Sequence, residues 1–111
     1  MKYLTIEGKQ KTSINELKNE LLQLMNYEPE ISTNGSNFKC FIIVYLEDDY
    51  NTFDVIRILV KHCSNFKVVV DEEVEYESFL SVYYYWDGKN LIRCYKDYFG
   101  SSCENVNFLL D

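Results

Sequence analysis

The chain has 111 residues, the size of one domain, and residues 1–111 are predicted to form a single α+β domain with its own core. An aromatic content of 16% excludes a disordered chain, because such chains are poor in aromatic side chains. Eighteen acids against eleven bases give a formal net charge of −7, which argues against direct binding to nucleic acid or to an anionic membrane. The same charge permits a basic protein partner, or it only keeps the protein dissolved.

The four cysteines, Cys40, Cys63, Cys94 and Cys103, are too widely spaced for a CxxC motif. The single histidine, His62, cannot complete a zinc motif with them. The first residues lack the apolar segment and cleavage site of a secretory signal, and no apolar run is long enough to cross a membrane. We therefore expect a cytoplasmic protein whose thiols are reduced and buried.

The first predicted element is a short strand over residues 2–7, which Gly8 ends. Ser13 and Glu16 have the spacing of a capping box, which predicts that a helix begins here. Apolar residues then recur at helical spacing until about Tyr27, where a following proline disfavours further helix.

The middle of the chain predicts a loop, a strand and a second helix. Residues 28–37 have loop composition, and residues 38–46 form an apolar run typical of a central strand covered on both faces. Asn51 or Thr52 can cap a helix that continues to about Cys63. A strand remains an alternative for this segment, because many of its residues are β-branched.

The second half of the chain predicts mostly strands. Residues 64–65 suggest a turn, and strands are expected over residues 66–76 and 78–86. Asp87-Gly88 is a strong hairpin signal, so residues 89–96 should return as the partner strand.

The hairpin turn also predicts a register and two faces. A two-residue turn pairs Trp86 with Lys89 and Tyr84 with Leu91. One face then carries Leu80, Val82, Tyr84, Trp86, Leu91, Arg93 and Tyr95, and the other carries Phe79, Ser81, Tyr83, Tyr85, Ile92 and Cys94.

The C-terminal residues predict a loop and a short apolar tail, Phe108 to Leu110, that either adds an edge strand or covers the core. The expected order is β-α-β-α-β-β-β, with or without a final strand. This order predicts a twisted, mainly antiparallel sheet with two helices on one face.

The stretch from Phe38 to Phe99 resembles the small ferredoxin-like, YubB-like proteins of phages and plasmids. The likeness is carried by a strand, a helix, a strand ending in acids, and an aromatic strand that runs into Trp86-Asp87-Gly88. The chain departs from that fold after the hairpin, because residues 98–107 have no helical stripe. The resemblance implies a mobile element as the origin, where small acidic inhibitors of host defence nucleases also occur, and it carries over no functional residue.

Two acidic stretches form the main candidate site. Five acids fall within seven residues: Asp71, Glu72, Glu73, Glu75 and Glu77. Glu47, Asp48 and Asp49 form a second stretch before the second helix. Since closely spaced carboxylates repel one another, they serve either as a surface that imitates a phosphate backbone or as a charged strand edge that prevents aggregation.

The sequence also contains candidate metal ligands, one histidine and a cluster of tyrosines. Oxygen ligands for Mg²⁺ or Ca²⁺ are conceivable at Asp48, Asp49, Asp54, Asp71 and Glu73, but their spacing matches no EF-hand loop. His62 at a helix end suits a partner of the helix dipole better than a catalytic base. We therefore expect no enzyme, no cofactor and no metal. The tyrosines around Trp86 fit core packing and a protein interface better than base stacking, which normally needs a basic groove.

We therefore expect a non-enzymatic inhibitor or nucleic-acid-mimicking decoy, for example of the anti-CRISPR kind, that binds a basic nucleic-acid-handling protein or nuclease complex. Its expected binding residues are both acidic stretches with Tyr84, Trp86 and Asp87. The alternative is an immunity or structural protein that binds a partner, or itself as a homodimer, through an aromatic surface.

Overall fold

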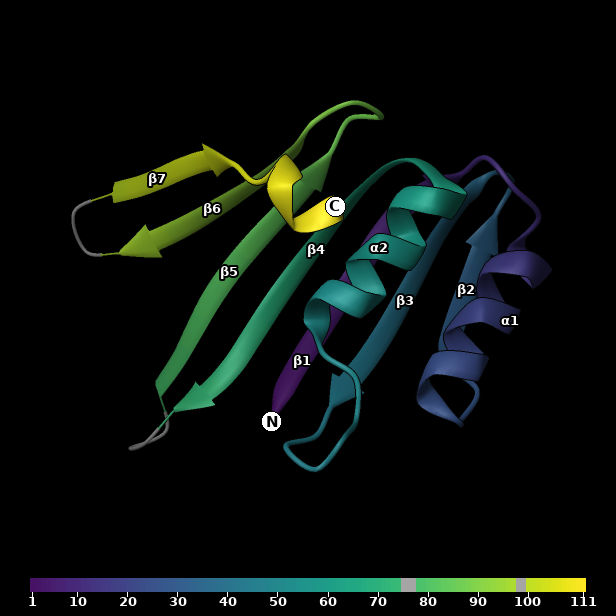
Figure 1. Ribbon diagram of the computed structural model, residues 1–111, viewed down its shortest axis with the longest axis horizontal. Helices are drawn as coiled ribbons and strands as arrows, with labels where there is room; N and C mark the ends of the chain where they lie inside the picture. Colours follow the sequence, from purple (N-terminus) through teal and green to yellow (C-terminus); the bar gives the residue numbers. More distant parts are fainter. Residues whose placement is uncertain (75–77, 98–99) are drawn as a thin grey trace.

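The computed structural model describes the backbone of residues 1–74, 78–97 and 100–111, and the side chains outside residues 73–80 and 97–99. Figure 1 shows a two-layer α+β fold with one twisted sheet. Its elements are β1 Lys2–Gln10, α1 Ile14–Met25, β2 Glu30–Asn34, β3 Asn37–Val44, α2 Thr52–His62, β4 Cys63–Val74, β5 Ser78–Trp86, β6 Leu91–Asp97, β7 Gly100–Asn105 and a 3-10 helix Asn107–Leu110. The seven strands pair antiparallel in the order β2-β3-β1-β4-β5-β6-β7, so the predicted antiparallel α+β class is confirmed.

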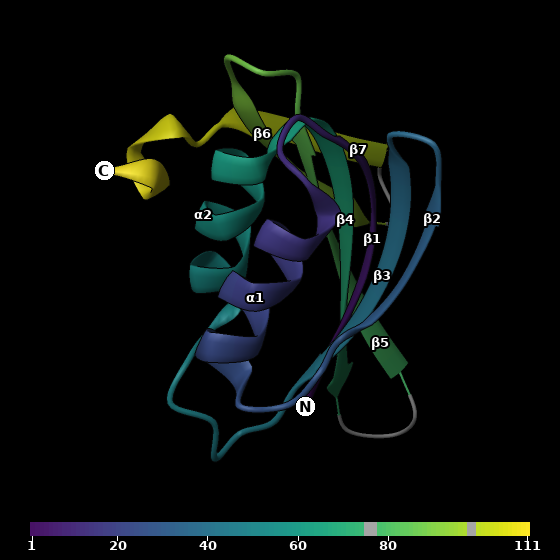
Figure 2. The same cartoon turned by 90° about the vertical axis from the view of Figure 1, so that its right-hand side faces the viewer.

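The strand register separates the side chains into two faces. Leu4 of the central strand β1 lies opposite Ile42 of β3 and Val70 of β4, and all three are buried. The helices bury their own apolar stripes in the same core, with Leu17 of α1 and Leu59 of α2 fully buried. Figure 2 shows both helices on one side of the sheet. We call that side the helix-covered face and the other side the open face.

Both helices begin as the capping residues predict. The Ser13 hydroxyl accepts from the backbone N–H of Glu16, and the Glu16 carboxylate accepts from the N–H of Ser13. Asn51 and Asp54 form the same reciprocal pair at α2, so Asn51 is the N-cap of this helix. The alternative of a strand in place of α2 is wrong.

The first predicted strand is too short and the first predicted loop is wrong. β1 continues through Gly8, where an added Cβ would lie 2.7 Å from the carbonyl oxygen of Asn65 and 2.8 Å from Cβ of Phe66. Gly8 therefore marks a close approach between strands rather than a strand end. Within residues 28–37, β2 pairs with β3 around a two-residue turn in which Gly35 has a φ of 65°.

Two further strand predictions need correction. β4 begins at Cys63 directly after α2, so residues 64–65 belong to a strand and not to a turn. β3 is not covered on both faces, because Cys40 and Ile42 are buried whereas Phe41 between them is 40% exposed. The apolar run in β3 thus supplies the core on one side and an apolar surface on the other.

The predicted register of the hairpin is wrong by two residues, whereas the predicted division of its side chains between two faces is right. Trp86 pairs with Leu91, because a four-residue turn replaces the two-residue turn. The Asp87 carboxylate accepts from the amides of Lys89 and Asn90 at 2.8 and 2.7 Å, which stabilises the longer turn. A shift of two residues leaves every side chain on its predicted face.

The C-terminal segment contains a strand that sequence reasoning missed. β7 pairs with β6, so the predicted loop is wrong, and Cys94 lies opposite Cys103 and forms a disulfide with it. The expectation of four reduced thiols is therefore wrong for this pair. The tail covers the core and forms no edge strand, since Leu109 and Leu110 pack against the core residues. Within the described residues, no helix is both long and apolar enough to cross a membrane.

Candidate functional site: an acidic end and an open sheet face

The antiparallel register brings the two acidic stretches to one end of the sheet. Lys2 at the start of β1 pairs with Val44 at the end of β3 and with Glu72 near the end of β4. The loop that carries Glu47 and Asp49 follows directly from β3, and Figure 1 shows this loop and the end of β4 at the same end of the molecule. We call Glu47, Asp48, Asp49 and Glu72 the acidic end.

Some acids elsewhere in the fold form ion pairs with lysine or arginine. Such ion pairs join Lys18 to Glu28, Arg57 to Asp54, Lys61 to Glu20 and Arg93 to Glu104. Within the described part of the chain, Glu47, Asp49 and Glu72 take part in none of these pairs. Glu47 and Asp49 are also exposed, so their negative charge faces solvent uncompensated.

Neighbouring acids of β4 lie on opposite faces of the sheet, as strand alternation predicts. Asp71 lies on the open face and accepts a hydrogen bond from the Ser81 hydroxyl. Glu72 lies on the helix-covered face, beside Thr52 at the start of α2. The side chains of Glu73, Glu75 and Glu77 lie outside the described residues.

The three other predicted binding residues have structural roles. Tyr84 is only 5% exposed and packs edge-to-face against Phe53, with ring centroids 6.3 Å apart, so it is core rather than surface. Its burial raises the pKa of its hydroxyl. Trp86 packs against the core, and Asp87 holds the hairpin turn through two backbone amides, which lower its carboxyl pKa. The prediction that Tyr84 lies on a binding surface is therefore wrong, whereas Trp86 and Asp87 also line the hollow described next.

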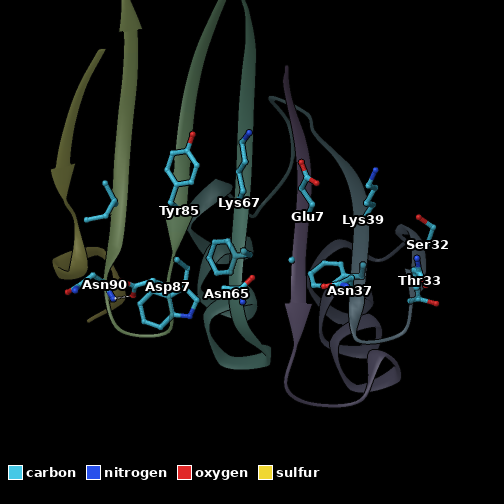
Figure 3. Close-up of a pocket in the computed structure, with 16 residues that line it drawn as sticks. Glu7, Ser32, Thr33, Asn37, Lys39, Asn65, Lys67, Tyr85, Asp87 and Asn90 are labelled. Carbon is cyan, nitrogen blue, oxygen red and sulfur yellow. Dashed lines mark hydrogen bonds between the residues drawn. The ribbon is translucent and has the colours of Figure 1, made fainter. Parts of the chain in front are cut away.

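The open face carries a row of polar side chains that sequence reasoning did not identify. Successive pairings place Ser32, Lys39, Glu7, Lys67 and Tyr85 side by side on β2, β3, β1, β4 and β5. We call these five residues the open-face row. Figure 3 shows the five side chains next to one another on neighbouring strands. They line a hollow of about 730 Å³, which Asn37 and Asn65 also line. Only the strand pairing could have revealed the row, because its members are far apart in the sequence.

Aromatic rings and lysines meet on this face. The ammonium of Lys67 lies 6.0 Å from the ring centroid of Tyr83 and 5.9 Å from that of Tyr85. Lys96 lies 4.8 Å from the ring of Tyr83. Such cation–π contacts orient the lysine side chains across the sheet while they stay accessible to a partner.

A hydroxyl, an imidazole and a carboxylate meet between the helices, as in some hydrolases. The Thr12 hydroxyl lies 2.7 Å from Nδ1 of His62, whose Nε2 lies 3.2 Å from the Glu20 carboxylate. His62 is only 5% exposed, and it lines none of four hollows that the described residues form on the surface. The cluster instead links the start of α1 to the end of α2.

Metal and thiol chemistry find little support in the described residues. Among them, no three His, Cys, Asp or Glu side chains are grouped to hold a metal ion. The free thiols of Cys40 and Cys63 are buried, and burial raises the pKa of each to about 12, which makes them poor nucleophiles at neutral pH.

Comparison of the chain with protein-family models, with curated proteins and with solved structures gives no match. The functional argument therefore depends on the two surfaces just described.

Proposed function

We propose that this protein is a non-enzymatic inhibitor or decoy that captures a basic protein, of the kind that handles nucleic acid, with its acidic end. The observation that carries the proposal is the placement of Glu47 and Asp49, which form no ion pair within the described residues, at the same end of the sheet as Glu72, whose cross-strand neighbour is Lys2. A cluster of uncompensated carboxylates raises the local concentration of a lysine- or arginine-rich surface and speeds its association.

The arrangement of charge around α2 supports this choice. Glu20 and Asp54 form ion pairs with basic residues of α2. The loop before α2 carries Glu47 and Asp49, which are exposed and form no ion pair within the described residues, so it is a source of negative potential.

The proposal is tested with three tagged baits exposed to bacterial lysate. The first is the wild type, and the second carries Glu47→Gln, Asp49→Asn and Glu72→Gln. The third carries Asn15→Lys, Asn19→Lys and Gln23→Lys on the exposed side of α1, which changes the net charge by the same amount.

The wild type and the lysine control should recover the same basic protein, released by added salt, and the neutralised variant should fail to do so. Recovery of that protein by all three baits would reject the acidic end as the binding surface. Equal loss from the second and third baits would show that only net charge matters, which would also reject it.

A further inference from the structure

The centre of the open face is apolar and aromatic. Its apolar side chains, from five adjacent strands, are Tyr3, Phe41, Ile43, Val69, Tyr83, Tyr85 and Ile92. Phe41 and Tyr85 are 40% and 39% exposed, and the rings of Tyr3 and Phe41 stack at 6.4 Å. Figure 2 shows the helices and the C-terminal segment on the opposite side of the sheet. An apolar surface of this extent is a mark of an interaction site.

The dimensions of this face match those of a stable interface. Seven strands separated by about 4.8 Å, each about six residues long at about 3.4 Å per residue, give a face of about 600 Å². Two such faces in contact would bury about 1,200 Å², the lower limit for a specific protein–protein interface. Charged residues border the apolar centre, as the rim of an interface requires.

We propose that the open face binds the open face of a second copy of this chain, so that the protein is a homodimer with its sheets packed face to face. This interface lies apart from the acidic end and leaves the loop of Glu47 and Asp49 free for a basic partner. A two-fold symmetric contact requires the face to be complementary to itself. Its charged residues must therefore lie over residues of opposite charge in the second copy.

A two-fold axis across the strands brings opposite charges together, whereas an axis along β1 brings like charges together. If the axis runs across the strands at the level of Val69, Lys67 of one copy lies over Asp71 of the other, because these residues flank Val69 on the same face of β4. If the axis instead runs along β1, the open-face row lies over itself and Lys39 of one copy lies over Lys67 of the other. Opposite charges attract and like charges repel, so the first orientation is the one we infer.

The same orientation also matches the shape of the surface. The hollow lies beside Lys67 and Lys39, on one side of the level of Val69, whereas Tyr3 lies on the other side. Rotation about the chosen axis therefore brings the stacked Tyr3 ring of one copy towards the hollow of the other. A protruding aromatic ring that fills a hollow is the usual anchor of a protein interface.

Single-stranded nucleic acid is the competing occupant of an aromatic sheet face. The net charge of −7 opposes it, and Glu7 and Asp71 place carboxylates between the lysines that a phosphate backbone would need. These acids are no obstacle to a second copy, because each can lie near a lysine or a hydroxyl of the partner.

Sedimentation velocity over a range of protein concentrations tests the homodimer. The wild type should show a concentration-dependent monomer–dimer equilibrium. Lys67→Asp and Asp71→Lys should each raise the dimer dissociation constant by about tenfold or more, and the double variant should restore dimerisation. Thr5→Arg, at an exposed position in the centre of the face, should also prevent it. The control Lys89→Asp, in the exposed hairpin turn, should leave the equilibrium unchanged.

Circular dichroism of each variant shows whether it is folded, and Thr5→Arg remains informative if a change at Asp71 perturbs its hydrogen bond to Ser81. A wild type that is monomeric at every concentration would overturn the proposal. A dimer that none of the single variants weakens would also overturn it, as would a monomer that binds an oligonucleotide through this face.

Discussion

The acidic end and the open face differ in how they arrange charge. At the acidic end, Glu47 and Asp49 are exposed and form no ion pair within the described residues, so an excess of negative potential reaches into solvent. On the open face, Lys39 and Lys67 flank Glu7 across three strands, and the apolar centre lies beside them. The first region suits any basic surface, whereas the second requires a surface with a matching pattern. One small sheet thus carries two surfaces that differ in their pattern of charge.

The largest effect is expected from a substitution in the central strand β1, because both regions depend on this strand. Gly8→Val would place side-chain atoms against the carbonyl of Asn65 and against Phe66, and the backbone of β4 would have to move. We expect a loss of about 3 kcal/mol in the free energy of unfolding, measured by urea denaturation.

Gly35→Asn provides the matched control for this experiment. Gly35 has open space around it and a φ of 65°, which asparagine tolerates, so its stability should change by less than about 1 kcal/mol. An equally stable Gly8→Val variant would contradict the close packing of β1 against β4.

The next prediction compares substitutions of two neighbouring tyrosines whose side chains lie on opposite faces of the sheet. Tyr84→Ala should cost about 3 kcal/mol in unfolding free energy, because the ring is buried against Phe53. Tyr85→Ala should cost less than about 1 kcal/mol, since this ring is on the open face, and should instead weaken dimerisation. Thermal unfolding and sedimentation of both variants measure the difference, and equal destabilisation would show that the open face is covered within one chain.

The sequence predicts these faces better than it predicts their roles. Alternation in residues 78–86 places Tyr84 and Tyr85 on opposite faces, and the capping boxes predict where both helices begin. Which tyrosine is buried depends on where the helices lie, and the local sequence does not contain that information.

Strand pairing explains why the remaining elements were not predicted correctly from the sequence. Residues 28–37 lack the apolar pattern of a strand because β2 is an exposed edge strand, so composition alone suggested a loop. β7 is exposed along its whole length for the same reason. The open-face row and the partners of the acids are products of the register, which follows from the complete fold.

A smaller effect on stability is expected at Glu20, which, unlike Glu47 and Asp49, has basic partners. The Lys61 ammonium, together with His62, holds the pKa of the Glu20 carboxyl below its ordinary value of 4.5. Since the pKa is lower in the folded state, this stabilisation is complete above pH 4.5 and is lost as the pH falls through the folded-state pKa.

Glu20→Gln should therefore lower the melting temperature at neutral pH and have little effect in acid well below pH 4.5. Glu30→Gln, at an exposed position, is the control and should change neither melting temperature. A pH-independent effect of Glu20→Gln would contradict the ion pairs between α1 and α2.

The most direct test of the central claim is a salt series of binding to immobilised poly-L-lysine. The wild type is compared with the variant neutralised at Glu47, Asp49 and Glu72 and with the lysine control on α1, which has the same net charge as that variant. We predict that the neutralised variant binds at least about tenfold more weakly at low salt and depends less on salt, whereas the control remains close to the wild type. Equal weakening of the two variants would show that binding follows net charge alone, and would contradict a binding surface at the acidic end.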